Sequence, residues 1–326
     1  MDVAAFFRQS HVLVVAGKGG VGKTTITAAL ARTAATAGLS VLVLELEGKL
    51  GVPAAYGLPG SLGYEEAELA EGAGGDDGRV RARRITPDDA LLEYLADHGM
   101  RRVSKRLVSS GALDVVSTAI PGIRDILVLG KVKSLEREGA ADLILVDAPA
   151  TGHAMTFLTS AQGLLDAARS GPVRTQAADV VELLTDPSRC QVALVTLPEE
   201  MPVNEVVEAA YQLEDRVGIS LGPVIANACL PEEPELAVDP AAAAAEAGVT
   251  LSPVELEALA AAARFRARRR RLQEEQLARL ATELPLPQLR APFLFSASIG
   301  PDEVGVLADA LAVGIAALPA PADADR

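Results

Sequence analysis

Residues 11–25 read HVLVVAGKGGVGKTT, and this stretch decides the fold. The apolar run at 11–16 predicts a buried strand, because most of its residues are valine or leucine and no turn residue interrupts it. A glycine-rich turn follows at 17–22, and the alanine-rich segment after it predicts a helix. Strand, loop and helix in this order form the context in which the pattern GxxxxGK(S/T), present at 17–24, predicts a phosphate-binding loop.

The loop residues predict a site for the phosphates of ATP. Glycines leave backbone N–H groups free to point at phosphate oxygens, and the helix that opens at Lys23 adds the positive end of its dipole. Lys23 is expected to reach the β- and γ-phosphates, and the Thr24 hydroxyl is expected to ligate Mg²⁺. An ordinary glycine turn would explain neither residue. The predicted nucleotide-binding residues are Gly17, Lys18, Gly19, Gly20, Val21, Gly22, Lys23, Thr24 and Thr25.

A second lysine, Lys18, lies directly after the first glycine of the loop. It resembles the signature lysine of the deviant Walker A class of phosphate-loop ATPases, which crosses a dimer interface to the nucleotide of the partner. The alternative is a solvated loop lysine. The resemblance implies that Lys18 acts in catalysis together with Lys23 and couples nucleotide binding to dimerisation.

The composition limits the class of protein. With 326 residues, 49% of them hydrophobic, the chain is long enough for one large α/β domain over 1–326, or for one domain with an insertion. There is no Trp, so the core must be aliphatic. Lys and Arg total 30 against 44 Asp and Glu, a formal net charge of −14, which argues against a general binder of nucleic acid or anionic membranes.

The cysteines and the ends of the chain predict a cytoplasmic protein. Cys190 and Cys229 lie beside apolar runs and form no CxxC pair, so we expect small buried hydrophobic residues rather than a disulfide or a zinc site. The first residues, MDVAAFFRQS, lack the pattern of a secretory signal. The apolar stretch at 304–318 is short and carries Asp309, which favours a packed helix over a membrane span.

Apolar runs and turn residues place the remaining elements of a mostly parallel sheet with helices on both faces. A helical region from Pro87 to about 138 is longer than an ordinary crossover and predicts a helical insertion over 86–140. Residues 70–78 and 231–253 read as loops, the second with room for a short helix, and 319–326 reads as a disordered tail. Strands are predicted at 41–46, 80–85, 142–147, 191–196, 222–227 and 294–296, and helices at 204–217, 256–284 and from 302 onward.

Carboxylates follow two of these strands. Asp147 ends the run 142–147 in the shape of a Walker B strand, so we expect it to hold the Mg²⁺ shell, with a helix N-cap as the alternative. The segment that follows it, 148–153, is a candidate switch for the γ-phosphate. Glu47 comes after the strand 41–46, at the end that faces the ligand crevice of an open α/β sheet, and we expect it to orient the attacking water.

The arginine-rich stretch ARFRARRRRLQEEQLARL, within the helix at 256–284, admits two interpretations. One is contact with nucleic acid. The other is a solvated helix face, because Arg270 and Arg271 lie four residues before Glu274 and Glu275. We favour the second and predict no nucleic-acid partner.

With these pieces placed, the chain resembles the ArsA ATPase family, which includes the arsenite-pump ATPase and the targeting ATPase for tail-anchored membrane proteins. The resemblance rests on the loop GKGGVGKTT at 17–25 and on the segment DAPATGH at 147–153, which is similar to the family switch DTAPTGH. The motifs PGI at 121–123 and TLPE at 196–199 are also similar to those of the family. The resemblance implies that Asn227 contacts adenine and that Pro292 and Phe293 form the other side of the adenine pocket.

Several departures from the family pattern matter. The family commonly has DPAH after the second strand, where this chain has EGKL at 47–50, so Glu47 replaces an aspartate with a side chain one methylene longer. The pattern EGKL resembles that of a bacterial, actinobacterial-type branch of the family. The separated cysteines do not supply the clustered thiols of an arsenite site, and no CxxC zinc site exists. Because there is no second phosphate loop, two active sites require a homodimer or a heterodimer with a paralogue.

The client of such an ATPase is left open. Targeting ATPases use methionine-rich grooves, whereas this chain has four methionines, of which Met100 alone lies in the insertion. A hydrophobic protein client stays among the partners to be tested. The leading interpretation is a Mg²⁺-dependent ATPase whose dimer couples ATP binding and hydrolysis to the helical insertion. The alternative is a nucleotide-dependent binding module with negligible turnover.

Overall fold

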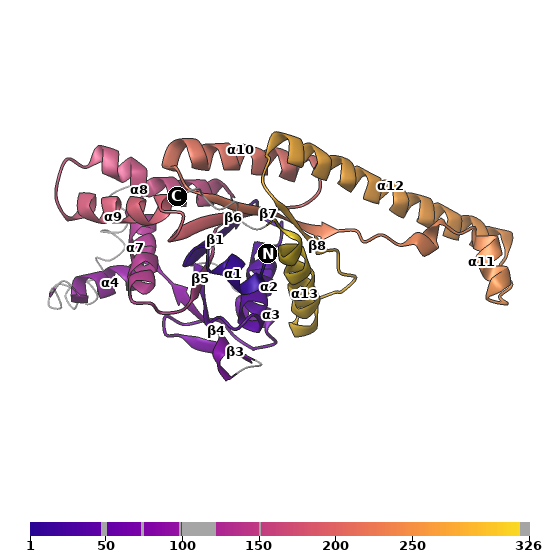
Figure 1. Cartoon of the computed structure of the whole chain (residues 1–326), viewed down its shortest axis with the longest axis horizontal. Coiled ribbons are helices and arrows are strands. Elements are labelled where there is room, and N and C mark those ends of the chain that lie inside the picture. The colour runs from indigo at the N-terminus through magenta and orange to yellow at the C-terminus, as the bar shows by residue number, and fades with distance from the viewer. Residues whose placement is uncertain (47–50, 73–74, 98, 100–121, 150, 320–326) are drawn as a thin grey trace.

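The computed structural model describes residues 1–326 except 47–50, 73–74, 98, 100–121, 150 and 320–326 (Figure 1). Its strands form an eight-stranded sheet in the order β3-β4-β2-β5-β1-β6-β7-β8. Every neighbouring pair is parallel except β3 and β4, so the prediction of a mostly parallel α/β fold is confirmed. The strands are β1 Val12–Gly17, β2 Val41–Leu46, β3 Ala67–Gly72, β4 Gly75–Ile85, β5 Leu143–Asp147, β6 Cys190–Thr196, β7 Leu221–Cys229 and β8 Gln288–Pro292.

The central strands are covered on both faces. Every residue of β1, β2 and β5 is buried. A strand that is buried on both sides needs apolar residues on both sides, which is why these runs are continuous rather than alternating. Two polar exceptions, Glu45 and Asp147, stand near the carboxyl ends of β2 and β5 and pair with one another in the register of the sheet.

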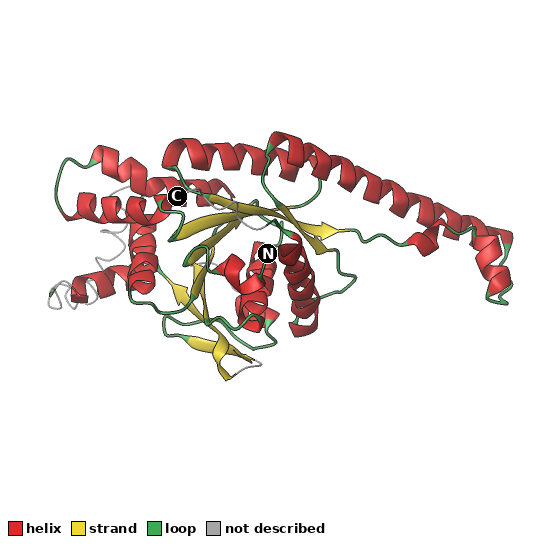
Figure 2. Ribbon diagram, in the orientation of Figure 1, coloured by secondary structure: helices red, strands yellow, loops and turns green. Residues whose placement is uncertain are grey.

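Helices cover the two faces of the sheet and build two separate cores (Figure 2). One face carries α1 Val3–Phe7, α2 Lys23–Thr36, α3 Val52–Ala55 and α13 Pro301–Ala317. The other carries α4 Pro87–Asp97, α7 Ile123–Arg137, α8 Thr151–Ala167, α9 Pro172–Thr185 and α10 Glu200–Val217. Alanine is frequent in α2, so this helix can approach the strands closely.

The predicted insertion at 86–140 is described only at its two ends. Helix α4 packs on α7, and α7 buries residues such as Ile126 and Leu129 in the core that α8 and α9 share. The middle of the insertion, including Met100, lies outside the described residues. The boundaries of a helical subdomain therefore stay a prediction, as does the tail at 319–326, nearly all of which is also outside them.

A long helical arm is inserted between β7 and β8 and projects beyond the sheet (Figure 1). It contains the 3₁₀ helix η1 Pro234–Ala237, α11 Pro240–Glu246 and α12 Pro253–Glu283. The start of α12 is fixed by a capping box between Ser252 and Glu255. The arm agrees with the predicted long helix and with the short helix allowed at 231–253.

Among the described residues, half of the ion-paired arginines of α12 pair with carboxylates outside this helix. The predicted pair Arg271–Glu275 forms at 3.9 Å, but Arg270 contacts Glu232 at 3.3 Å and Glu274 accepts from Arg290 at 2.8 Å. Spacing in the sequence predicts partners within one helix only. In the structure, Arg270 and Glu274 pair instead with residues of neighbouring segments. These pairs account for part of the positive charge of the stretch without a nucleic-acid partner.

Two element predictions are wrong. Residues 70–78, expected to be a loop, lie largely in the antiparallel hairpin of β3 and β4. The last strand is β8, Gln288–Pro292, rather than 294–296, because Leu289 and Ala291 are buried while Arg290 is exposed, the alternation of an edge strand. Among the described residues, no helix is both long and apolar enough to cross a membrane.

Candidate nucleotide-binding site

The loop at 17–22 lies where β1 ends and α2 begins, at the carboxyl edge of the parallel strands. Gly17 is the register partner of Val195 in β6. A Cβ at Gly17 would lie 2.2 Å from the carbonyl oxygen of Val195, and the φ of Gly17 is +152°. Both observations exclude a side chain at this position, because the neighbouring contact is backbone and cannot move aside.

Asn227 braces this loop from β7. Its side-chain Nδ2 donates to the carbonyl oxygen of Val21 at 2.9 Å, and its Oδ1 accepts from the backbone N–H of Ala228 at 2.9 Å. A Cβ at Gly22, whose φ is +89°, would lie 2.3 Å from that same Nδ2. The last glycine of the loop therefore makes room for the amide that holds it.

The two lysines of the loop point to different partners. Lys23, the first residue of α2, is 7% exposed, and its Nζ donates to the carbonyl oxygen of Lys18 at 2.9 Å. The Lys18 ammonium forms an ion pair with Glu205 of α10 in the same chain. Lys18 is thus neither buried nor an unattached surface lysine.

Thr24 and Asp147, the two predicted metal ligands, are in direct contact. The Thr24 hydroxyl donates to Oδ2 of Asp147 at 2.6 Å, and Asp147 is fully buried at the end of β5. A hydroxyl and a carboxylate oxygen at the rim of a phosphate loop are the hard oxygen donors that Mg²⁺ prefers. The donor set therefore fits Mg²⁺, with Thr24 and Asp147 as the residues that would hold it.

A buried carboxylate that the sequence analysis missed stands beside this pair. Glu45 of β2 is fully buried, is the register partner of Asp147, and accepts from the backbone N–H of Gly51 at 2.9 Å through Oε1. The available signal was a glutamate inside the apolar run VLVLEL. Glu47, the predicted water-orienting residue, lies outside the described residues.

The predicted adenine-pocket residues come together at the same edge. Pro292 ends β8 next to Cys229 of β7, and the backbone N–H of Phe293 donates to the carbonyl oxygen of Cys229 at 2.8 Å. Phe293 is 40% exposed and contacts Phe295 edge to face, with ring centroids 4.9 Å apart. The guanidinium of Arg266 lies 4.9 Å from the centre of the Phe295 ring. Phe295 and Arg266 could not be predicted as neighbours, because they are far apart in the sequence and meet only through the fold of the arm.

Burial suppresses thiolate chemistry at both cysteines. Desolvation raises the pKa of Cys190, which is fully buried, to about 12, and that of Cys229 to about 11. Because the thiolate is the form that attacks and that ligates soft metals, both cysteines behave as small apolar residues at neutral pH.

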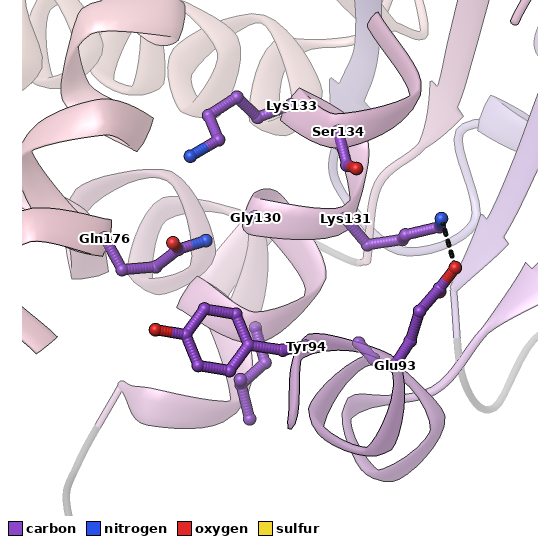
Figure 3. Close-up of a pocket in the computed structure, with 9 residues that line it drawn as sticks. Glu93, Tyr94, Gly130, Lys131, Lys133, Ser134 and Gln176 are labelled. Atoms are coloured by element: carbon purple, nitrogen blue, oxygen red, sulfur yellow. Dashed lines mark hydrogen bonds and ion pairs between the residues drawn. The ribbon is translucent and has the colours of Figure 1, made fainter. Parts of the chain in front are cut away.

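A pocket of about 100 Å³ lies between α4, α7 and α9, away from the loop (Figure 3). Its lysines are already paired: Lys131 donates to Glu93 at 2.7 Å, and Lys133 donates to Asp179 of α9 at 2.7 Å. Burial acts to raise the pKa of Glu93, but the hydrogen bonds from Lys131 and Tyr64 outweigh it and lower that pKa. The polar side chains around the pocket therefore form a structural network that joins α7 to α4 and to α9.

Comparison with known proteins agrees with this geometry. The family model described as the CobQ/CobB/MinD/ParA nucleotide binding domain matches residues 12–227, from the first residue of β1 to Asn227. ATPase BagA of Mycobacterium tuberculosis is 38% identical over 232 residues, which cover 67% of this chain and 65% of that protein. An arsenical pump-driving ATPase of Escherichia coli is 29% identical over 215 residues, covering 65% of this chain and 34% of that protein.

A eukaryotic protein is similar over a shorter stretch: ATPase get3 of Schizosaccharomyces japonicus is 29% identical over 146 residues, 45% of this chain and 42% of that protein. The chain spans 65% of the length of its mycobacterial relative and less of the other two. The loop, the contact between Thr24 and the buried Asp147, and these matches lead to one conclusion. The chain belongs to the CobQ/CobB/MinD/ParA family of nucleotide-binding domains, and its relatives are consistent with the ArsA-type ATPases.

Proposed function

We propose that the protein is a Mg²⁺-dependent ATPase whose two nucleotide sites form in a dimer. The observation that carries the proposal is the 2.6 Å contact between Thr24 and the fully buried Asp147, at the rim of a loop in which a Cβ at Gly17 or Gly22 would collide with its surroundings. Such a loop and donor pair fit the phosphates and the metal of a nucleoside triphosphate. Magnesium, when bound, supplies positive charge that neutralises the transferring phosphoryl group.

The residues of the chain perform binding and orientation. Backbone N–H groups of the loop and the start of α2 face the phosphates. Lys23 exchanges the Lys18 carbonyl oxygen, which it contacts at 2.9 Å, for phosphate oxygens. We propose Glu47 as the residue that orients the attacking water. Catalysis of this kind depends mostly on positioning and electrostatic stabilisation.

The dimer is proposed on the basis of Lys18. To reach the nucleotide of a partner chain, this lysine must leave Glu205, with which it pairs in the single chain. Nucleotide phosphates offer it a stronger negative charge than one carboxylate does, so ATP would favour the exchange. The second chain is either an identical copy or a paralogue.

We propose that the ATP cycle acts on the helical region at 86–140 and its neighbours. An apolar groove of about 650 Å³ lies between α8 and α9, close to the start of α7. None of the described residues that line it is charged; they are apolar or carry hydroxyl groups, which supports a hydrophobic protein segment as the client. The groove is lined by Gly122, Thr156, Thr159, Ser160, Gly163, Leu164, Ala167, Ala168 and Val173.

Single-turnover hydrolysis of ATP tests the proposed activity. Wild-type protein in excess over labelled ATP should release ADP and phosphate in the presence of Mg²⁺, and Lys23→Ala should abolish this release. The matched control is Lys133→Ala, which removes a lysine of the structural network. If ATP binds tightly but no phosphate appears over many hours, the enzyme proposal fails and a nucleotide-dependent binding module replaces it.

A further inference from the structure

Glu45 is a charged residue at a place where charge is costly. It lies inside a fully buried strand, between β4 and β5, and is 0% exposed. Burying a carboxylate is unfavourable unless hydrogen bonds compensate the lost water. A residue retained at such a cost has a structural or functional consequence, and its contacts identify which.

The carboxylate holds the backbone at Gly51. Oε1 of Glu45 accepts from the Gly51 N–H at 2.9 Å, and Gly51 is the N-cap residue of α3. Gly51 in turn lies against Thr24, because a Cβ built on Gly51 would be only 2.7 Å from Cγ2 of Thr24. The glycine backbone therefore borders the space that the Thr24 methyl group occupies.

The position of that methyl group decides where the Thr24 hydroxyl points. A threonine side chain in a helix chooses among staggered rotamers, and one of its common choices sends the hydroxyl back to a carbonyl of the preceding turn. Thr27 and Thr33 of the same helix make that choice, donating to the carbonyl oxygens of Lys23 and Ala29 at 2.9 and 2.8 Å. Thr24 instead donates to Asp147 at 2.6 Å.

We propose that Glu45 is a positioning residue for the metal-binding hydroxyl: by holding Gly51 against the Thr24 methyl group, it selects the rotamer in which the hydroxyl faces Asp147. This inference rests on the proposed function, because it takes the Thr24 hydroxyl as a Mg²⁺ ligand. It assigns to β2 a part in metal binding through a residue that does not itself touch the metal.

The expected magnitude follows from the rotamers. Without the contact, the Thr24 side chain can distribute over the two rotamers that threonine commonly adopts in a helix, so the productive one falls to about half of the population. The apparent affinity for Mg²⁺ in the nucleotide complex falls by the same fraction, which is an approximately twofold loss. Nucleotide binding without Mg²⁺ should not change, because the phosphate loop itself is untouched.

The experiment measures the affinity of the full-length protein for a fluorescent ATP analogue across a Mg²⁺ titration and in EDTA. Glu45→Ala should lose about twofold in Mg²⁺ affinity and nothing in Mg²⁺-free nucleotide affinity, whereas Glu45→Gln, which keeps an acceptor oxygen of the same reach, should behave as the wild type. In a Thr24→Ser background, which retains the hydroxyl but has no methyl group to hold, Glu45→Ala should cause no further loss. Gly51→Ala, which presses directly on the methyl group, serves as the second variant if Glu45→Ala does not fold.

The outcomes separate the inference from the proposed function. An equal loss from Glu45→Ala in the wild-type and Thr24→Ser proteins overturns the inference, and so does no loss in either. If Thr24→Ala itself leaves the Mg²⁺ titration unchanged, the hydroxyl is no ligand, and the metal site of the proposed function fails together with the inference. If Thr24→Ala weakens Mg²⁺ binding while Glu45→Ala does not, only the inference fails.

Discussion

Replacing Asn227 with alanine removes two hydrogen bonds of its side chain, one that ties β7 to the phosphate loop and one that is local to β7. These are the bond from Nδ2 to the Val21 carbonyl oxygen and the bond from the Ala228 N–H to Oδ1, each 2.9 Å long. A net contribution of about 0.5–1.5 kcal/mol for each bond gives a loss of about 1–3 kcal/mol in the free energy of unfolding. With an unfolding entropy of about 2.1 cal/mol/K per residue, each kcal/mol lowers Tm by roughly 1.5 °C in a chain of this length.

The assay combines thermal melting with titration of ATP and GTP, and Asn227→Asp is the matched variant. Aspartate keeps the acceptor for Ala228 but places a carboxylate oxygen against the Val21 carbonyl, so it should weaken nucleotide binding at least as much as alanine does. If Asn227 also contacts adenine, the ratio of ATP to GTP affinity changes; if it acts as a brace alone, both affinities fall together. An alanine variant with unaltered Tm and unaltered affinity for both nucleotides would refute the reasoning.

Three further predictions concern other parts of the site and core. Glu205→Gln weakens the hold on Lys18, so dimers should form at lower ATP concentration, as measured by light scattering. Gly17→Ala should abolish nucleotide binding and lower Tm, because its Cβ would lie 2.2 Å from a backbone oxygen of β6. Glu136 has a lowered pKa, chiefly through its hydrogen bonds with Arg189, so its stabilising effect is present above the unfolded pKa and disappears as pH falls through the folded one. Glu136→Gln should therefore destabilise by about 1–3 kcal/mol near pH 7, and the loss should shrink as pH falls from about 4 through the lowered folded pKa in denaturant titrations.

Two of these predictions have a matched control variant, one from the same helix and one at another glycine with positive φ. Glu208→Gln changes a neighbouring carboxylate of α10 that pairs with Gln212 and should leave dimerisation alone. Gly139→Ala introduces a side chain at a φ of +63° with no described atom within 4 Å of the new Cβ, so it measures backbone strain without the collision at the loop. A stability loss in Glu136→Gln that is the same at acid and neutral pH would contradict the assignment to its charge.

The centre of this fold was predictable from the sequence for a physical reason. Strands buried on both faces require uninterrupted apolar runs, and the loop between β1 and α2 needs glycines where a Cβ would collide, as at Gly17. Both requirements concern residues that are adjacent in the sequence, so both are visible in the sequence of one chain. Asp147 was predictable in the same way, as an acidic residue that ends an apolar strand.

Features that depend on distant partners were not predictable. Glu45 lies in an apolar run, and its role depends on its hydrogen bond with Gly51 and on its place beside Asp147 in the neighbouring strand. The sequence does not show which strands are neighbours. The strand β8 was misplaced because an edge strand needs only alternate apolar residues. The pairs of Arg270 and Glu274 with other elements follow from the fold of the arm.

Calorimetric titration of the folded, full-length protein with ATP in the presence of Mg²⁺ tests the central claim most directly. The account predicts saturable binding of one nucleotide per chain, weakened when Mg²⁺ is withheld and lost in Lys23→Ala. No heat of binding from wild-type protein that melts cooperatively would contradict it, because a loop built with this geometry would then hold no triphosphate.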